Sequence, residues 1–140
     1  MRTVLVPIDG SECSLQALHY LIGARDDNRV VTLHLLNVQP TMTGDVSQFI
    51  ARSDLDDYRR AQCEEALRPA RDLLEGAGIA YQTQLAVGHV ADCITRCAEE
   101  LDCDHIVMGT HGRSALTEFL VGSTTLKVLH HAKVPVVLVK

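Results

Sequence analysis

The chain has 140 residues and a formal net charge of −5, and 46% of its residues are apolar. This length is typical of one domain, and the apolar fraction is too high for a disordered chain. No stretch is densely basic, which argues against nucleic acid or an anionic membrane as the main partner. The apolar runs fall well short of the ~20 residues of a spanning helix, and no targeting segment is visible. We therefore expect one domain, residues 1–140, in the cytoplasm.

The chain begins with signals for a strand, a helix and a second strand. A β-branched run at residues 3–8 predicts a strand that ends in the turn sequence Asp9-Gly10. Ser11 is a good N-cap for the helix that follows, where apolar residues recur at helical spacing. The apolar run Val30 to Val38 predicts the second strand.

A long helix is expected after a polar loop. Ser53 begins a sequence similar to a capping box, and the helix should end at residues 76–78, where glycine can adopt the left-handed conformation. Pro69 lies inside this helix. Because a mid-helix proline removes a hydrogen bond and costs ~3 kcal/mol, we expect a kink or a division near Leu67.

The second half of the chain repeats the alternation of strand and helix. Strands are predicted at residues 80–86, 105–109 and 134–140, and helices at 89–102 and 124–132. Polar alternation in the first of these strands suits an edge position. Short, nearly all-apolar strands are buried on both faces, which predicts an α/β domain with a parallel sheet and helices on both faces.

The connections predict the order of the strands. Crossovers between parallel strands are right-handed, so an open sheet with both faces covered must reverse its winding somewhere. If the chain winds outward from the first strand to the third and then returns beside the first, the order is 3-2-1-4-5. This is a Rossmann-like, open, five-stranded sheet. The crevice between the first and fourth strands, outside their carboxyl ends, is the expected ligand site.

The cysteines admit two interpretations. There are five, an odd number, which argues against a disulfide framework. Cys93 and Cys97 lie four residues apart, with Cys103, His130 and His131 further on, so a metal site is one interpretation. Cys93 and Cys97 also fall on one apolar helical stripe, and a free cysteine behaves as a small buried hydrophobe. We favour the buried stripe.

A segment rich in glycine and hydroxyls joins the fourth predicted strand to the last helix. Its residues of interest are Gly109, Gly112, Gly122, Ser123, Thr124 and Thr125. Glycine lets the backbone turn with positive φ or approach a ligand closely, and a helix start offers unpaired N–H groups to an anion. Arg113 adds a positive fork suited to phosphate. Neither GxxxxGK[ST] nor GxGxxG occurs, so the residues alone leave both a phosphate loop and ordinary turn glycines open.

The spacing Gly109-x2-Gly112-x9-Gly122-Ser123 resembles the ATP-binding signature of the universal stress protein family. The opening segment VLVPIDGSECSLQAL and the closing segment KVLHHAKVPVVLVK are also similar to that family, so the resemblance spans the chain. It implies a Rossmann-like domain that holds ATP, or AMP or ADP, at the switch point. It also implies Mg²⁺ or Mn²⁺ with the nucleotide, and a homodimer.

The resemblance further implies which residues bind. Pro7 and Asp9 would border the adenosine, Val38 would meet adenine through its backbone, Met108 would line the base and Gly109 would lie against the ribose. The residues implied to face the phosphates are Gly112, Arg113, Gly122, Ser123, Thr124 and Thr125. The metal would be held through the phosphates, with Asp9 or Ser123 beside it. The alternatives are that Pro7 and Val38 only end buried strands, that Asp9 is a turn residue and that Arg113 is a solvated surface residue.

Three functions remain open on the sequence. The first, which we favour, is an ATP-binding regulatory module with an unidentified protein partner and at most slow hydrolysis. The second is an enzyme, a slow ATPase or nucleotidyl transferase, for which the predicted site offers only Asp9 and His111 as bases. The third is a structural dimer that binds no nucleotide. Val134 to Val139 would form an apolar edge strand, so we expect a homodimer under all three.

Overall fold

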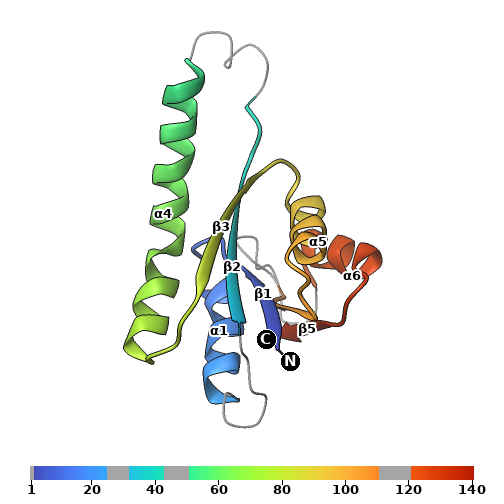
Figure 1. The fold of residues 1–140 in the computed structure, drawn as a ribbon. Helices are drawn as coiled ribbons and strands as arrows, with labels where there is room; N and C mark the ends of the chain where they lie inside the picture. The colour runs from blue at the N-terminus through green and yellow to red at the C-terminus, as the bar shows by residue number, and fades with distance from the viewer. Residues whose placement is uncertain (1, 25–31, 43–50, 111–120) are drawn as a thin grey trace.

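A computed structural model describes residues 2–24, 32–42, 51–110 and 121–140. The strands are β1 (Thr3–Pro7), β2 (Thr32–Gln39), β3 (Gln82–Val87), β4 (His105–Gly109) and β5 (Val136–Val139). The helices of this part of the chain are α1 (Glu12–Gly23), α4 (Arg52–Gly76), α5 (Val90–Glu100) and α6 (Ser123–His131). All strand pairs are parallel and the order is β3-β2-β1-β4-β5 (Figure 1). This confirms the predicted α/β class and strand order, with β3 and β5 at the edges.

Successive residues of the central strands pack into two separate cores. Val4 and Val6 are fully buried in a core with residues of α1 and α4, whereas Leu5 between them is buried in a core with residues of α5 and α6. A strand with both faces buried must be apolar throughout, which is why β1 shows no polar alternation. Helices therefore cover both faces of the sheet, as predicted (Figure 1).

The turn from β1 into α1 is held by two side chains. The Asp9 carboxylate accepts a hydrogen bond from the Ser11 N–H (Oδ1–N 2.9 Å), and the Ser11 hydroxyl accepts one from the Ser14 N–H (3.2 Å). Gly10 between them has φ +88°, a conformation that side chains disfavour. Ser11 is the N-cap of α1, as predicted. These contacts place the start of α1 directly after the carboxyl end of β1.

The helix α4 begins differently from the prediction. It starts at Arg52, one residue before the proposed cap, and Ala51 is the N-cap without a side-chain hydrogen bond. The first helical bond runs from the Leu55 N–H to the Ala51 carbonyl (3.0 Å). Ser53 therefore lies inside the first turn, and the predicted capping box is wrong.

The proline in α4 does not divide the helix. Of the kink or division expected near Leu67, the division is wrong, because Arg52–Gly76 is one unbroken helix with Pro69 inside it, and the kink stays a prediction. Pro69 lies on the exposed side of the helix, where water can hydrate the backbone carbonyl that loses its partner. The C-terminal end is as expected, because Gly78 has φ +68°.

Asp104 joins the beginnings of β1 and β4. Its Oδ2 accepts hydrogen bonds from the N–H groups of Arg2 (2.8 Å) and Thr3 (3.0 Å), and its Oδ1 lies 2.7 Å from His105 Nδ1. Burial alone would raise the pKa of the Asp104 carboxyl, but the hydrogen bonds to His105, Thr3 and Arg2 outweigh it and lower that pKa below its usual value. The carboxylate form therefore stabilises the fold.

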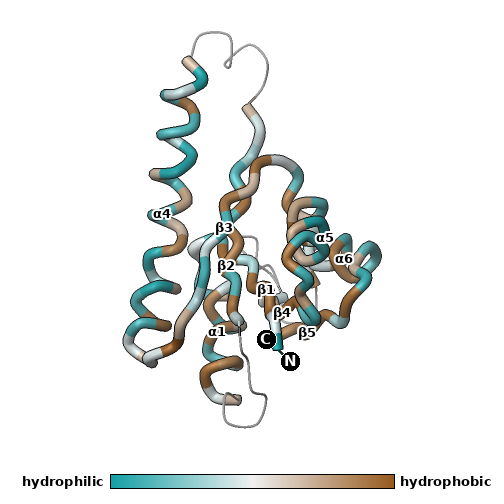
Figure 2. Tube along the Cα trace, in the orientation of Figure 1, coloured by the Kyte–Doolittle hydropathy of each residue, from teal (hydrophilic) through white to brown (hydrophobic). Residues whose placement is uncertain are grey.

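The cysteine stripe of α5 is buried. Cys93 and Cys97 are buried free thiols, and Cys97 and Cys103 belong to the core that contains Leu5. Burial raises the pKa of the Cys97 thiol and raises that of Cys103 to about 11. Most of α4 is coloured as hydrophilic, as expected for a helix with one buried side (Figure 2). None of the helices described here is both long and apolar enough to cross a membrane.

Candidate functional site

A pocket of about 380 Å³ opens at the carboxyl ends of β1 and β4. These strands pair only at Val4 with His105 and at Leu5 with Ile106, whereas β1 stays paired with β2 as far as Pro7. Beyond Leu5 the two strands therefore part, and the pocket occupies the space between them. This is the winding reversal that the strand order predicts, and a pocket lies where the ligand site was expected.

The structure brings most of the predicted site residues to this pocket. Those that line it are Pro7, Asp9, Val38, Met108, Gly109, Gly122, Ser123, Thr124 and Thr125. His111, Gly112 and Arg113 lie outside the described residues. Two loops far apart in the sequence, after β1 and before α6, thus meet at one pocket.

One end of the pocket is formed by the N-terminus of α6. Gly122 is the N-cap and makes no side-chain cap, and its own N–H donates to the Thr110 carbonyl (2.8 Å). The first helical bond runs from the Leu126 N–H to the Gly122 carbonyl (3.0 Å). Helix geometry therefore leaves the N–H groups of Ser123 and Thr124 without an intrahelical acceptor, at the positive end of the helix dipole. This end of the pocket suits an anion.

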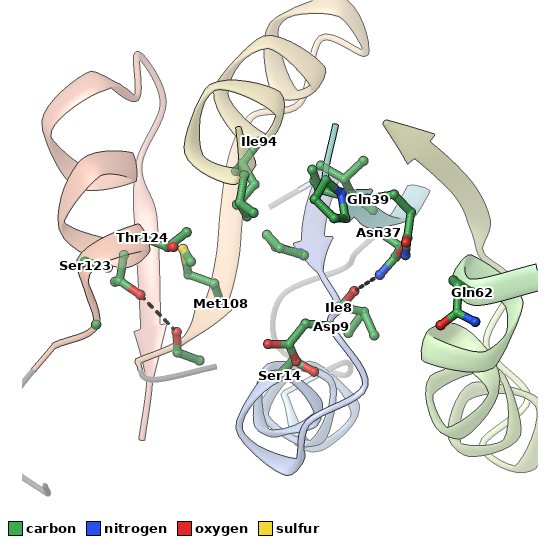
Figure 3. A pocket seen from close by; sticks show the side chains of 18 residues that line it. Ile8, Asp9, Ser14, Asn37, Gln39, Gln62, Ile94, Met108, Ser123 and Thr124 are labelled. Atoms are coloured by element: carbon green, nitrogen blue, oxygen red, sulfur yellow. Dashed lines mark hydrogen bonds between the residues drawn. The ribbon is translucent and has the colours of Figure 1, made fainter. Parts of the chain in front are cut away.

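The hydroxyls beside this helix start have different environments. Thr125 is buried, and its Oγ1 is 3.3 Å from the Thr110 carbonyl and 3.5 Å from that of Gly109, to which it donates. Its hydroxyl therefore fastens the helix to the end of β4. Ser123 and Thr124 are labelled on the pocket wall beside Met108 (Figure 3). These two are the better hydroxyl donors to a ligand.

Positive φ, one of the two reasons predicted for the glycines of the motif, is not found at Gly109 or Gly122. Gly122 has φ −61° and ψ 155°, which any residue can adopt, and Gly109 has no positive φ either. A Cβ added to Gly109 would overlap the carbonyl oxygen of Cys13 in the first turn of α1. Position 109 therefore requires glycine because α1 lies against β4. Neither Gly109 nor Gly122 is required for a positive φ.

Asp9 combines the two roles that the sequence left open. Its carboxylate accepts the Ser11 N–H in the turn, and the residue also lines the pocket. It is the single ionisable side chain among the described residues of the lining. Within that part of the site, acid–base chemistry could use only this carboxylate.

Sequence reasoning missed three amide side chains at the opposite end of the pocket. Asn37 Nδ2 donates to the Ile8 carbonyl (2.8 Å), and Gln39 Nε2 donates to Asn37 Oδ1 (2.7 Å). Gln62 of α4 projects toward the same end (Figure 3). Asn37 lies inside an apolar run and is buried, and a polar residue in such a run is the one signal that could have identified it. Gln62 is distant from Asn37 and Gln39 in the sequence, and no sequence pattern indicated that it lines the pocket.

Apolar side chains close the pocket between its two ends. Leu36 and Val38 come from β2, Ile94 from α5 and Met108 from β4. Leu36, Ile94 and Met108 are buried, so the walls belong to the core and are rigidly supported. The arrangement fits a ligand with a flat apolar ring at the amide end and an anionic group at the α6 end.

Comparison with known proteins gives a consistent result over the whole chain. The profile of the universal stress protein family matches residues 1–140. Universal stress protein MJ0531 of Methanocaldococcus jannaschii is 29% identical, with 99% of this chain and 82% of the relative covered.

Two solved structures are similar at comparable identity. That of the hypothetical protein MJ0577, from the same organism, has a TM-score of 0.83 at 27% identity, with 99% of this chain and 95% of that chain covered. A universal stress protein in complex with cAMP has a TM-score of 0.71 at 26% identity, with 99% and 97% covered.

Proposed function

The chain belongs to the universal stress protein family, and from this premise we propose that it is a regulatory module that binds ATP in the pocket between β1 and β4. The observation that carries the proposal is the α6 N-terminus opening onto that pocket with Ser123 and Thr124 at its first turn. A relative that is 26% identical has been solved in complex with cAMP, which supports a nucleotide as the ligand class. AMP and ADP carry the same anionic groups and are alternative ligands.

The phosphates would lie against the start of α6. The N–H groups of Ser123 and Thr124 point along the helix axis toward the pocket, and Gly122 leaves room for close approach. Gly112 and Arg113 would complete this end of the site. Mg²⁺ or Mn²⁺ would be bound through the phosphate oxygens, with the hydroxyl of Ser123 or the carboxylate of Asp9 as oxygen ligands of the kind such ions prefer.

The adenosine would occupy the rest of the pocket. Pro7 and Asp9 would border it, Met108 would line the base, and Val38 would contact adenine through its backbone. Gly109 would lie against the ribose. Binding of this kind regulates only if the nucleotide favours one state of the protein over another, such as one dimer arrangement or one partner complex.

A homodimer through β5 is part of the proposal. β5 is an edge strand whose four residues are all partly exposed, and Leu129 of the adjoining helix α6 is 42% exposed. A second copy that pairs along residues 134–139 would cover this apolar edge. Sedimentation should show a dimer at micromolar concentration, and a monomer would contradict the interface. Five free cysteines fit a reducing compartment, the cytoplasm.

Retention of nucleotide by the purified protein tests the central proposal. Protein prepared without added nucleotide should release ATP, ADP or AMP in native mass spectrometry. Gly122→Val should abolish this retention and keep the fold, because valine adopts the backbone angles of Gly122 but fills the space at the helix start. Gly23→Val is the matched control, since nothing lies within 4 Å of a Cβ at Gly23.

Two results would contradict this assignment. Unchanged retention in Gly122→Val would remove the α6 N-terminus from the site. Steady ATP turnover above roughly 1 s⁻¹, the low end of ordinary enzyme rates, would show an enzyme in place of a binding module.

A further inference from the structure

We propose that Gln39 makes the pocket select adenine over a 6-oxopurine, and that Asn37 fixes the amide orientation on which this selection depends. The inference rests on the proposed nucleotide binding and deepens it by assigning base specificity to a side chain. It starts from the hydrogen-bonded series that runs from the Ile8 carbonyl through Asn37 to Gln39.

The direction of this series is fixed at its buried end. The Ile8 carbonyl can only accept a hydrogen bond, so Asn37 must present its NH₂ group there (Nδ2–O 2.8 Å). Asn37 Oδ1 is then directed at Gln39 and can only accept, so Gln39 must present its own NH₂ group (Nε2–Oδ1 2.7 Å). Asn37 is only 3% exposed, and reversing either amide would set two oxygens or two N–H groups against each other.

The fixed orientation determines what Gln39 offers to a ligand. One hydrogen of its Nε2 is used by Asn37, which leaves Oε1 as an acceptor and the second Nε2 hydrogen as a donor. Gln39 lines the pocket and is only partly exposed. A ligand at this end therefore meets an acceptor and a donor side by side, in an order that cannot be exchanged by rotating the amide.

This pair complements adenine. The 6-amino group of adenine is a donor beside a ring-nitrogen acceptor, which is the pattern that a glutamine amide recognises in two hydrogen bonds. A 6-oxopurine has an oxygen in place of the amino group, so two acceptors would face each other. A free glutamine would simply rotate to accommodate the oxygen, whereas Gln39 held by Asn37 cannot.

The residues that line the pocket place the base at the end formed by Gln39 and Asn37. Gln39 and Asn37 lie on the side away from Ser123 and Thr124, which surround the anionic end (Figure 3). Between the two ends stand Ile94 and Met108, which form apolar surfaces for a flat ring. A nucleotide whose phosphates reach α6 thus places its base beside Gln39.

The test is to measure the dissociation constants of ATP and ITP by titration calorimetry on the full chain. ITP has a 6-oxo group in place of the 6-amino group and a hydrogen on N1, and is otherwise identical to ATP. The wild-type protein should bind ATP at least tenfold more tightly than ITP. Gln39→Met should weaken ATP about tenfold and bring the two constants within threefold of each other. Gln82→Met, at an exposed β3 position outside the pocket, is the matched control and should match wild type.

Asn37→Ala gives a readout that general loosening of the fold would not produce. Without Asn37 the Gln39 amide can rotate, so ITP should bind more tightly than it does to wild type while ATP binds more weakly. Weakening of both nucleotides by the same factor would overturn the orienting role of Asn37.

The remaining outcomes distinguish a failure of base selection from a failure of the proposed nucleotide binding. If wild type binds ATP and ITP within twofold, or if Gln39→Met keeps the tenfold preference, Gln39 does not select the base although nucleotide binding stands. If wild type binds neither nucleotide, the proposed function is refuted, and the base-selection proposal is overturned with it.

Discussion

Replacing Gly109 by alanine tests whether this glycine is set by packing between α1 and β4. The added Cβ would lie 2.8 Å from the Cys13 carbonyl carbon and closer still to its oxygen, where carbon atoms normally stay about 3.5 Å or more apart. Both partners are main chain, so no side-chain rotation relieves the overlap and α1 must move. Overpacking of a core costs ~1–3 kcal/mol, and the rigidity of both partners places this change near ~3 kcal/mol.

The assay is thermal and urea unfolding of purified protein without added nucleotide. A loss of ~3 kcal/mol in a domain of this size corresponds to a decrease in melting temperature of roughly 10 °C. Gly23→Ala is the control, because its Cβ meets nothing within 4 Å and the substitution should be neutral or stabilise by up to ~1 kcal/mol. Gly109→Ala within about 0.5 kcal/mol of wild type would refute the packing argument and leave only a ligand to explain the glycine.

Three further predictions concern the cap of α1, the carboxylate of Asp104 and the buried thiols. Ser11→Ala should lower the free energy of unfolding by ~1 kcal/mol through loss of the α1 cap, measured in urea, and a change below 0.3 kcal/mol would be inconsistent with a capping role. Asp104→Ala should cost ~1 kcal/mol at pH 7, a modest value because the side chain is 41% exposed. The pKa of Asp104 is lowered in the fold, so this difference should be complete above the unfolded-state pKa of about 4 and decrease as the pH falls through the lower folded-state pKa; a difference that does not decrease at all below pH 4 would exclude the carboxylate as its source. Under native conditions a thiol reagent should modify the half-buried Cys13 before Cys97 and Cys103, because burial and a raised pKa keep the latter two thiols protonated. The rates of modification can be followed by mass spectrometry, and equal rates would contradict the buried stripe.

The sheet and the location of the pocket follow from sequence patterns because they depend on averages over many residues. Continuous apolar runs predict strands that are buried on both faces, and the handedness of crossovers then leaves few orders for five of them. The pocket between β1 and β4 is a consequence of that order and needs no further information.

Features that depend on single contacts were not accessible in this way. The start of α4 at Arg52 and its continuity through Pro69 depend on the surroundings of each helical turn. Because Pro69 is exposed, water can replace the hydrogen bond that the proline removes. The requirement for glycine at position 109 arises from α1, more than ninety residues earlier in the chain. The role of Asn37 likewise depends on the carbonyl of Ile8, which follows the neighbouring strand β1.

The divergence of β1 from β4 has a consequence for how relatives of this chain lose binding. The opening is created by the path of the main chain, so substitutions can occupy it but cannot remove it without rewinding the sheet. A descendant that abandons its ligand should therefore acquire bulkier residues at positions such as 38, 94 or 122 and keep the same strand order. We therefore expect paralogues that have lost binding to show a filled pocket and an unchanged sheet.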